Sequence, residues 1–185
     1  MLKMLAARLL ALLGWKTHEP PGRPPKAVMI AYPHTSNWDA FYALLVKFAL
    51  GLDAHWAGKD NMFRPPFGGL LRKMGGVPVN RRERTGFVEQ MVAEFARREC
   101  FTLVIAPEGT RGLTGGWKSG FYRMAVAAQV PVALGFMDYT RREGGILAYL
   151  TLTGDRDADL ATIARLYADR PGKRPELASP IRWLD

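Results

Sequence analysis

The sequence predicts an α/β fold in which one central, mixed and largely parallel sheet lies between helices in a single-domain αβα sandwich. Short apolar runs of strand length alternate with segments whose apolar residues recur at helical spacing. With 48% apolar residues, the 185-residue chain can build one substantial core. Polar clusters follow two of the apolar runs directly, where buried strands are expected to end.

The N-terminal segment predicts an amphipathic helix within residues 1–19. Its leucines gather on one side of a helix, whereas Lys3 and Arg8 fall off that side. Arg8 interrupts the apolar run, no clear signal-peptide cleavage site follows, and a transmembrane helix needs roughly 20 apolar residues. The helix therefore suits either a bilayer interface or the protein's own core, and the sequence does not choose between them.

Four prolines separate this helix from the rest of the chain. They form a rigid connector over residues 20–25, because proline is not tolerated in a helix interior. The main domain then spans residues 26–170. Residues 171–185 predict a C-terminal tail that is loosely ordered as far as Pro180.

Strands and helices alternate along the main domain. Strands are expected in the apolar runs at 27–32, 54–58, 77–79, 101–106, 130–136 and 146–153. Helices are expected where the apolar spacing is helical, from the turn after His34 to about residue 50 and then at 67–74, 87–95, 119–129 and 157–170. This alternation is typical of helices packed on a parallel sheet.

The charge and the cysteine content indicate which binding partners and which redox compartment to expect. The formal net charge of +9 favours a polyanion, and residues 59–84 carry seven basic and two acidic side chains. The basic residues gather beside a candidate substrate loop and no nucleic-acid motif appears, so nucleic acid is not expected. Cys100 is the only cysteine, which excludes an intrachain disulfide and favours a reducing compartment. It precedes a predicted strand and is expected to be a small core residue.

His34 and Asp39 are the candidate acid–base pair. A histidine at the end of a strand can present one ring nitrogen to a cleft while a carboxylate accepts from the other nitrogen. The five-residue separation permits this contact without requiring it, and Asp39 also suits a solvated first helical turn. Ser36 is not expected to be a nucleophile, because no Gly-x-Ser-x-Gly turn surrounds it.

Two loops offer groups for binding a phosphate. Glu108-Gly109-Thr110-Arg111 follows the predicted strand at 101–106, and Arg81 ends the cluster that follows the strand at 77–79. Glycine beside arginine lets backbone amides and a guanidinium hold one phosphate together. A metal site is not expected, because His18 and His55 have no evident carboxylate partner.

Four sequence blocks occur in order between residues 27 and 137. They are His34-x4-Asp39, Gly76-Val-Pro-Val-Asn-Arg81, Glu108-Gly-Thr-Arg111 and Val130-Pro-Val-Ala-Leu134. In this order and spacing they resemble the blocks of the glycerolipid acyltransferase family, which includes the 1-acyl-glycerol-3-phosphate acyltransferases. The second block fits loosely, and the chain is shorter than typical lysophosphatidate acyltransferases.

The resemblance implies a role for each matching residue. His34 is the implied general base, Asp39 its orienting partner and Arg81 a contact to the acceptor phosphate. Glu108 and Arg111 are implied acceptor-site residues, in a loop that Gly109 and Thr110 shape. Lys118 occupies the position of an aromatic–lysine pair common in the family and could meet a donor or acceptor phosphate. Amides near the His34 turn or the Glu108 loop could steady the oxyanion.

The resemblance also implies the reaction. A fatty acyl group would pass from an acyl thioester, either acyl-CoA or acyl carrier protein, to the hydroxyl of a lysophospholipid such as 1-acyl-glycerol-3-phosphate. No cofactor beyond the co-substrate is expected, and the enzyme would lie peripherally at the cytoplasmic face of an anionic membrane. Two alternatives stay open: a non-glycerol lyso-lipid acceptor, for example an amino-acid-derived one, and a non-catalytic lipid- or membrane-binding protein of the same fold.

Overall fold

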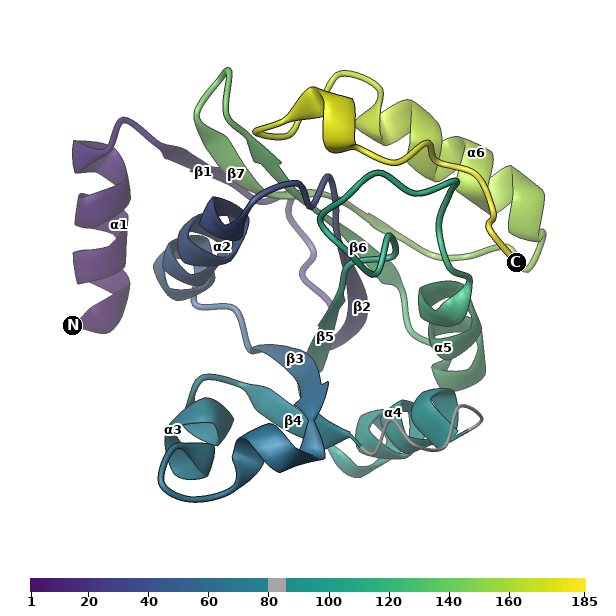
Figure 1. The fold of residues 1–185 in the computed structure, drawn as a ribbon, viewed down its shortest axis with the longest axis horizontal. Coiled ribbons are helices and arrows are strands. Elements are labelled where there is room, and N and C mark those ends of the chain that lie inside the picture. The colour runs from purple at the N-terminus through teal and green to yellow at the C-terminus, as the bar shows by residue number, and fades with distance from the viewer. Residues whose placement is uncertain (80–85) are drawn as a thin grey trace.

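A seven-stranded sheet crosses the protein in the order β1-β7-β6-β2-β5-β3-β4 (Figure 1). The structure is a computed structural model that describes residues 1–79 and 86–185. Every neighbouring pair is parallel except β6 and β7, which are antiparallel. The strands are β1 Lys16–His18, β2 Lys26–Ala31, β3 Ala54–Lys59, β4 Gly76–Val79, β5 Phe101–Ile105, β6 Val132–Asp138 and β7 Glu143–Leu150. The predicted mixed, largely parallel sheet is confirmed.

Helices cover both faces of the sheet (Figure 1). Helices α1 (Leu2–Leu12) and α2 (Asn37–Leu50) lie on one face, and α4 (Gly86–Arg97), α5 (Gly120–Ala128) and α6 (Arg156–Tyr167) lie on the other. The short elements η1 (Asp60–Phe63) and α3 (Gly68–Lys73) follow β3, and η2 (Pro175–Leu177) lies near the C-terminus. This arrangement is the predicted αβα sandwich in a single domain.

Strand β2 lies at the middle of the sheet, where it pairs with β5 and β6. Its residues 27–30 are all buried, because helices pack on both faces of the sheet. The sequence of a strand that is buried on both faces is a continuous apolar run. Val28 and Ile30 face the core formed with α4, α5 and α6, whereas Ala27 and Met29 face the opposite side. A strand held this firmly fixes the position of the turn that follows it.

The N-terminal segment is both a helix and a strand. Helix α1 ends at Leu12, and Ala6 and Leu10 pack in one cluster with Val46 and Ala49 of α2. Strand β1 was not predicted, because its sequence Lys-Thr-His is polar and exposed; backbone pairing with β7 defines it. One side of α1 therefore docks on the domain, while other leucines of this helix remain exposed.

Two other expectations are wrong. Residues 171–180 are not loosely ordered: Ser179 is fully buried, and its carbonyl accepts a hydrogen bond from the Tyr32 hydroxyl at 2.9 Å. The apolar and hydrogen-bonding partners of this segment lie far away in the sequence, so local composition did not reveal them. Cys100 is exposed rather than a core residue, because it lies in the turn before β5 and not on the strand.

Candidate active site

The turn between β2 and α2 presents His34 and Asp39 together. Ser36 caps α2, and its Oγ atom accepts a hydrogen bond from the Trp38 amide at 3.2 Å. The carboxylate of Asp39 reaches back and accepts from the Ser36 amide at 2.9 Å, which completes a capping box. Asp39 is 5% exposed, so it is not the solvated first-turn residue that the alternative interpretation describes.

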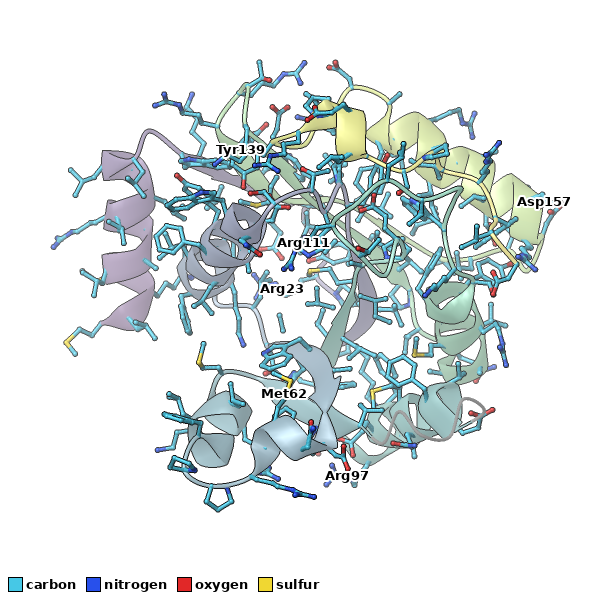
Figure 2. All side chains as sticks on the ribbon, in the orientation of Figure 1. Arg23, Met62, Arg97, Arg111, Tyr139 and Asp157 are labelled. Atoms are coloured by element: carbon cyan, nitrogen blue, oxygen red, sulfur yellow. The ribbon has the colours of Figure 1, made fainter. Side chains whose placement is uncertain are left out.

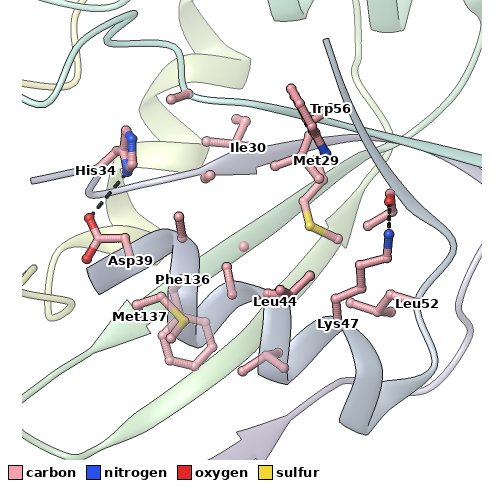
Figure 3. Close-up of a pocket in the computed structure, with 18 of the residues that line it drawn as sticks. Met29, Ile30, His34, Asp39, Leu44, Lys47, Leu52, Trp56, Phe136 and Met137 are labelled. Carbon is pink, nitrogen blue, oxygen red and sulfur yellow. Dashed lines mark hydrogen bonds and ion pairs between the residues drawn. The ribbon is translucent and has the colours of Figure 1, made fainter. Parts of the chain in front are cut away.

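The two side chains of the candidate pair are in contact. His34 Nδ1 lies 3.3 Å from Asp39 Oδ2, and the imidazole is about one quarter exposed (Figure 3). The same oxygen accepts from the Thr35 amide at 2.8 Å. Burial alone would raise the pKa of Asp39, but hydrogen bonds from His34, Tyr139 and the turn amides outweigh burial and lower that pKa below its ordinary value. Asp39 is therefore held as a carboxylate that can orient the ring.

Tyr139 is a site residue that the sequence analysis missed. Its hydroxyl donates to Asp39 Oδ1 at 2.7 Å, and Figure 2 shows it beside the start of α2. Burial, followed by the bond to Asp39, raises the pKa of Tyr139 well above its ordinary value, so it remains a donor. Trp15 and Tyr42 pack against its ring, with centroids at 5.1 and 5.8 Å. No local sequence signal links this tyrosine to Asp39, because β6 brings it there.

Glu108 is buried beneath the same turn and is 1% exposed. Its Oε2 atom accepts from the His34 amide at 2.8 Å, and its Oε1 atom accepts from the Ser179 amide at 2.9 Å. Burial raises the pKa of Glu108, and the amide bonds from Ser179 and His34 oppose that rise. Because both oxygens face backbone amides, Glu108 supports the His34 turn here; direct contact with an acceptor stays a prediction.

The loop after Glu108 carries one exposed cation, Arg111, and a second, Lys118, lies against Gly109 of this loop. Gly109 adopts a left-handed conformation with φ of 70°, and a Cβ there would come within 3.1 Å of Lys118 Nζ. Thr110 is exposed and its Oγ1 atom accepts from the Gly112 amide at 3.3 Å. Arg111 and Lys118 are exposed, and neither pairs with a carboxylate anywhere in residues 1–79 and 86–185. Both cations are thus available to an anionic ligand.

Arg81, the other predicted phosphate contact, lies outside the described residues, as do the rest of residues 80–85. The described part of the predicted basic region is exposed at Arg64, Arg72 and Lys73, on or before α3. Exposed Phe67 and Leu70 lie beside these cations in sequence. This surface therefore mixes positive charge with apolar side chains.

A cavity of about 680 Å³ runs between α2 and the sheet (Figure 3). His34 and Asp39 line one end, and Lys47 lines the other. The walls between them are mostly apolar and include Met29, Leu44, Leu52, Trp56, Val104 and Met137. Lys47 Nζ donates to the carbonyls of Ala54 at 2.6 Å and Met74 at 3.2 Å, and burial lowers the pKa of this lysine. The cavity suits a hydrocarbon chain whose reacting end lies at His34.

Two features are absent from the described part of the chain. No group of three or more His, Cys, Asp or Glu side chains there is arranged to hold a metal ion. No helix there has both the length and the apolar character needed to cross a membrane.

Comparison with known proteins identifies the family. A family model described as Acyltransferase matches residues 16–133. No curated protein sequence matches the chain. Among solved structures, the chain is similar to the 1-acyl-sn-glycerophosphate (LPA) acyltransferase PlsC from Thermotoga maritima. The TM-score is 0.59 at 15% identity, and the similarity covers 93% of this chain and 80% of that chain. At this identity the structural similarity shows the fold. Because the family match spans more than half of the chain and contains His34, Asp39 and Glu108, the protein belongs to the acyltransferase family and is an acyltransferase.

Proposed function

We propose that the protein transfers a fatty acyl group from an acyl thioester to the hydroxyl of a lysophospholipid, with 1-acyl-glycerol-3-phosphate as the first acceptor to test. The observation that carries this proposal is the apolar cavity that begins at the His34–Asp39 pair. A thioester whose acyl chain enters the cavity has its carbonyl carbon near His34. Membership of the acyltransferase family supports the same reaction.

His34 acts as the general base. Because Nδ1 faces Asp39, the ring proton belongs on that nitrogen, and Nε2 is left to take the proton of the acceptor hydroxyl. The hydroxyl oxygen attacks the thioester carbonyl, the C–S bond breaks, and the thiolate leaves with the proton that His34 returns. Asp39 stabilises the imidazolium between these two steps. General-base catalysis of this kind contributes about 10²–10⁴-fold.

The oxyanion donors come from the loop after Glu108. The amides of His34, Thr35 and Ser36 already donate to carboxylates, so these three amides do not supply them. The amides of Thr110 and Arg111 make no hydrogen bond within the described residues. They therefore remain available to a developing negative charge.

Arg111 and Lys118 bind the phosphate of the acceptor, because both are exposed cations without a carboxylate partner in the described residues. Arg81 is proposed to join them on the strength of the family resemblance. The same chemistry suits a lyso-lipid with another phosphate or a carboxylate, so the acceptor requires a direct test. CoA and acyl carrier protein remain alternative carriers of the donor acyl group.

The protein docks peripherally on an anionic membrane at its cytoplasmic face. Leu5 and Leu12 of α1 are 63% and 85% exposed, and Trp38 and Phe41 at the start of α2 are also exposed. Apolar side chains of this kind enter the interface, while a net charge of +9 favours anionic lipid. Docking through this surface brings the cavity mouth near the lipid that supplies the acceptor.

An acceptor panel tests the proposal. Purified protein is incubated with a long-chain acyl-CoA and, in turn, 1-acyl-glycerol-3-phosphate, its dephosphorylated form and an amino-acid-derived lyso-lipid, and the acylated products are measured by mass spectrometry. We expect phosphatidic acid as the main product. If only the amino-acid-derived lyso-lipid is acylated, that lipid and not 1-acyl-glycerol-3-phosphate is the acceptor. Thiol release without any acceptor would indicate a thioesterase.

A further inference from the structure

The C-terminal segment contributes a residue directly beneath the catalytic turn. Ser179 is fully buried although it lies in a loop after η2. Its amide donates to Glu108 Oε1 at 2.9 Å, and its carbonyl accepts from the Tyr32 hydroxyl at 2.9 Å. Residue 179 lies well beyond residues 16–133, over which the family match extends. The site of this protein is thus supported from outside the matched region.

The hydroxyl of Ser179 is also directed by its surroundings. Its Oγ atom accepts from the Thr114 amide at 3.0 Å and lies 2.9 Å from the Thr114 Oγ1 atom. Because the Thr114 hydroxyl donates to the Gly116 carbonyl at 2.9 Å, the Ser179 hydroxyl donates to Thr114 Oγ1, and residue 179 is held against the loop that follows Glu108. The amide of Ser179, which donates to Glu108, opposes the effect of burial, which raises the pKa of Glu108. Ser179 therefore favours the ionised form of this buried carboxyl group.

Glu108 connects Ser179 to the backbone of His34. Its second oxygen accepts from the His34 amide at 2.8 Å. An ionised carboxylate accepts at both oxygens, whereas a protonated one carries a hydrogen on one oxygen and loses acceptor capacity there. Ionised Glu108 thus holds the His34 backbone, and that backbone sets where the imidazole points.

We propose that Ser179 is a positioning residue of the active site: it keeps Glu108 as a two-oxygen acceptor, and Glu108 fixes the backbone that carries His34. The proposal rests on His34 being the base of the proposed acyl transfer. Besides Ser179, the polar and charged groups that act on Glu108 are His34 and Tyr32, and Lys118 lies against the adjacent Gly109.

The first test is the pH profile of Ser179→Ala. This variant removes the hydroxyl that holds residue 179 against Thr114, so the amide bond from residue 179 to Glu108 weakens and Glu108 becomes protonated at a higher pH. We expect the fall of kcat/KM on the acid side to move to higher pH, and kcat at neutral pH to fall about ten-fold with little change in KM. Ser119→Ala is the matched control, because Ser119 is also buried but bonds to Asp185 in the same C-terminal segment. An unchanged acid limb in Ser179→Ala would overturn the proposal.

The second test is a double-mutant cycle with Glu108→Gln. If Ser179 acts through Glu108, Ser179→Ala costs much less activity in the Glu108→Gln background than in the wild-type background. Equal fold losses in the two backgrounds would show that Ser179 acts by another route and would contradict the proposal.

A measurement on the unmodified protein avoids any loss of fold. The amide NMR signals of His34 and Ser179 are followed during a pH titration. Because both amides bond to the same carboxylate, we expect both signals to shift with one shared pKa. Separate transitions, or no response in either amide, would overturn the coupling. This readout needs no activity, so shared titration in a protein without acyl transfer would place the failure in the proposed function alone.

Discussion

The hydroxyl of Tyr139 donates a hydrogen bond to Asp39 Oδ1 at 2.7 Å, although the two residues are 100 positions apart in the sequence. The other oxygen of Asp39 faces His34 and two turn amides. Both oxygens of Asp39 are therefore fixed by hydrogen bonds, and the orientation of the His34 ring depends on the position of this carboxylate. The activity should therefore depend on a tyrosine that is bonded to Asp39.

Tyr139→Phe removes only this hydrogen bond. We expect kcat to fall about ten-fold and the free energy of unfolding to fall by about 1–2 kcal/mol, because a bond to a buried carboxylate is lost. Steady-state kinetics and urea unfolding measure the two effects. Tyr149→Phe serves as the control, because the Tyr149 hydroxyl bonds to Glu19 at 2.6 Å instead. Equal kcat losses in both variants would contradict the role given to Tyr139.

Asp39 also predicts a pH dependence of stability. Its pKa is lowered in the folded protein, so its stabilising contribution is complete above its unfolded pKa and is lost as the pH falls through its folded pKa. Asp39→Asn should therefore destabilise the protein at pH 7 more than at acidic pH. Urea unfolding of both proteins across this range measures the difference. A constant difference at every pH would mean that Asp39 does not titrate in this way.

Lys47 should limit the length of the acyl chain. From Asp39 to Lys47, helix α2 rises about 12 Å, and an extended chain advances roughly 1.2 Å per bond, so about ten bonds reach the lysine. Lys47→Ala removes the ammonium group from this end of the cavity, and we expect the preference among acyl-CoA donors to move to longer chains. Competition among donors of graded length measures the preference.

Lys26→Ala is the control for this change, since Lys26 Nζ likewise donates to a carbonyl, that of Phe95 at 2.7 Å, and does not line the cavity. Its preference should match that of the wild type. A Lys47→Ala enzyme with the same chain-length preference as Lys26→Ala would mean that the acyl chain does not reach Lys47.

The exposed leucines of α1 should control membrane binding. Replacing Leu5 and Leu12 together by Ser removes apolar surface without disturbing Ala6 and Leu10, which pack toward α2. We expect weaker sedimentation with anionic vesicles, and wild-type binding itself should weaken as salt rises. Leu166→Ser changes an exposed leucine of α6 and should bind normally. If the double variant binds as well as Leu166→Ser, docking uses another surface.

The sequence predicted those features whose cause is local. The apolar run of β2 and the helical spacing in α2 led to the fold and to the turn at His34, because side-chain periodicity follows directly from backbone geometry. The separation of His34 and Asp39 permitted the contact, and the capping box of Ser36 and Asp39 explains how the turn achieves it. The family resemblance, confirmed by the family match, supplied the reaction class.

Features that depend on distant pairing were not predicted. Strand β1 has no apolar pattern and exists through its pairing with β7, while Tyr139 and Ser179 reach the site through strand β6 and the C-terminal segment. The cavity is likewise formed by the distance at which α2 packs on the sheet, which no single segment encodes. Arg81 stays a prediction, because it lies outside the described residues.

The measurement that most directly tests the central claim is acceptor-dependent thiol release from a long-chain acyl-CoA by wild-type protein, His34→Ala and His18→Ala. His18 is the control because its Nδ1 atom bonds to the Ile146 carbonyl at 2.8 Å, in strand β7. With circular dichroism showing three folded proteins, we predict that His34→Ala loses about 10²–10⁴-fold in turnover while His18→Ala remains close to wild type. Near-normal turnover by His34→Ala would contradict the assignment of His34 as the general base.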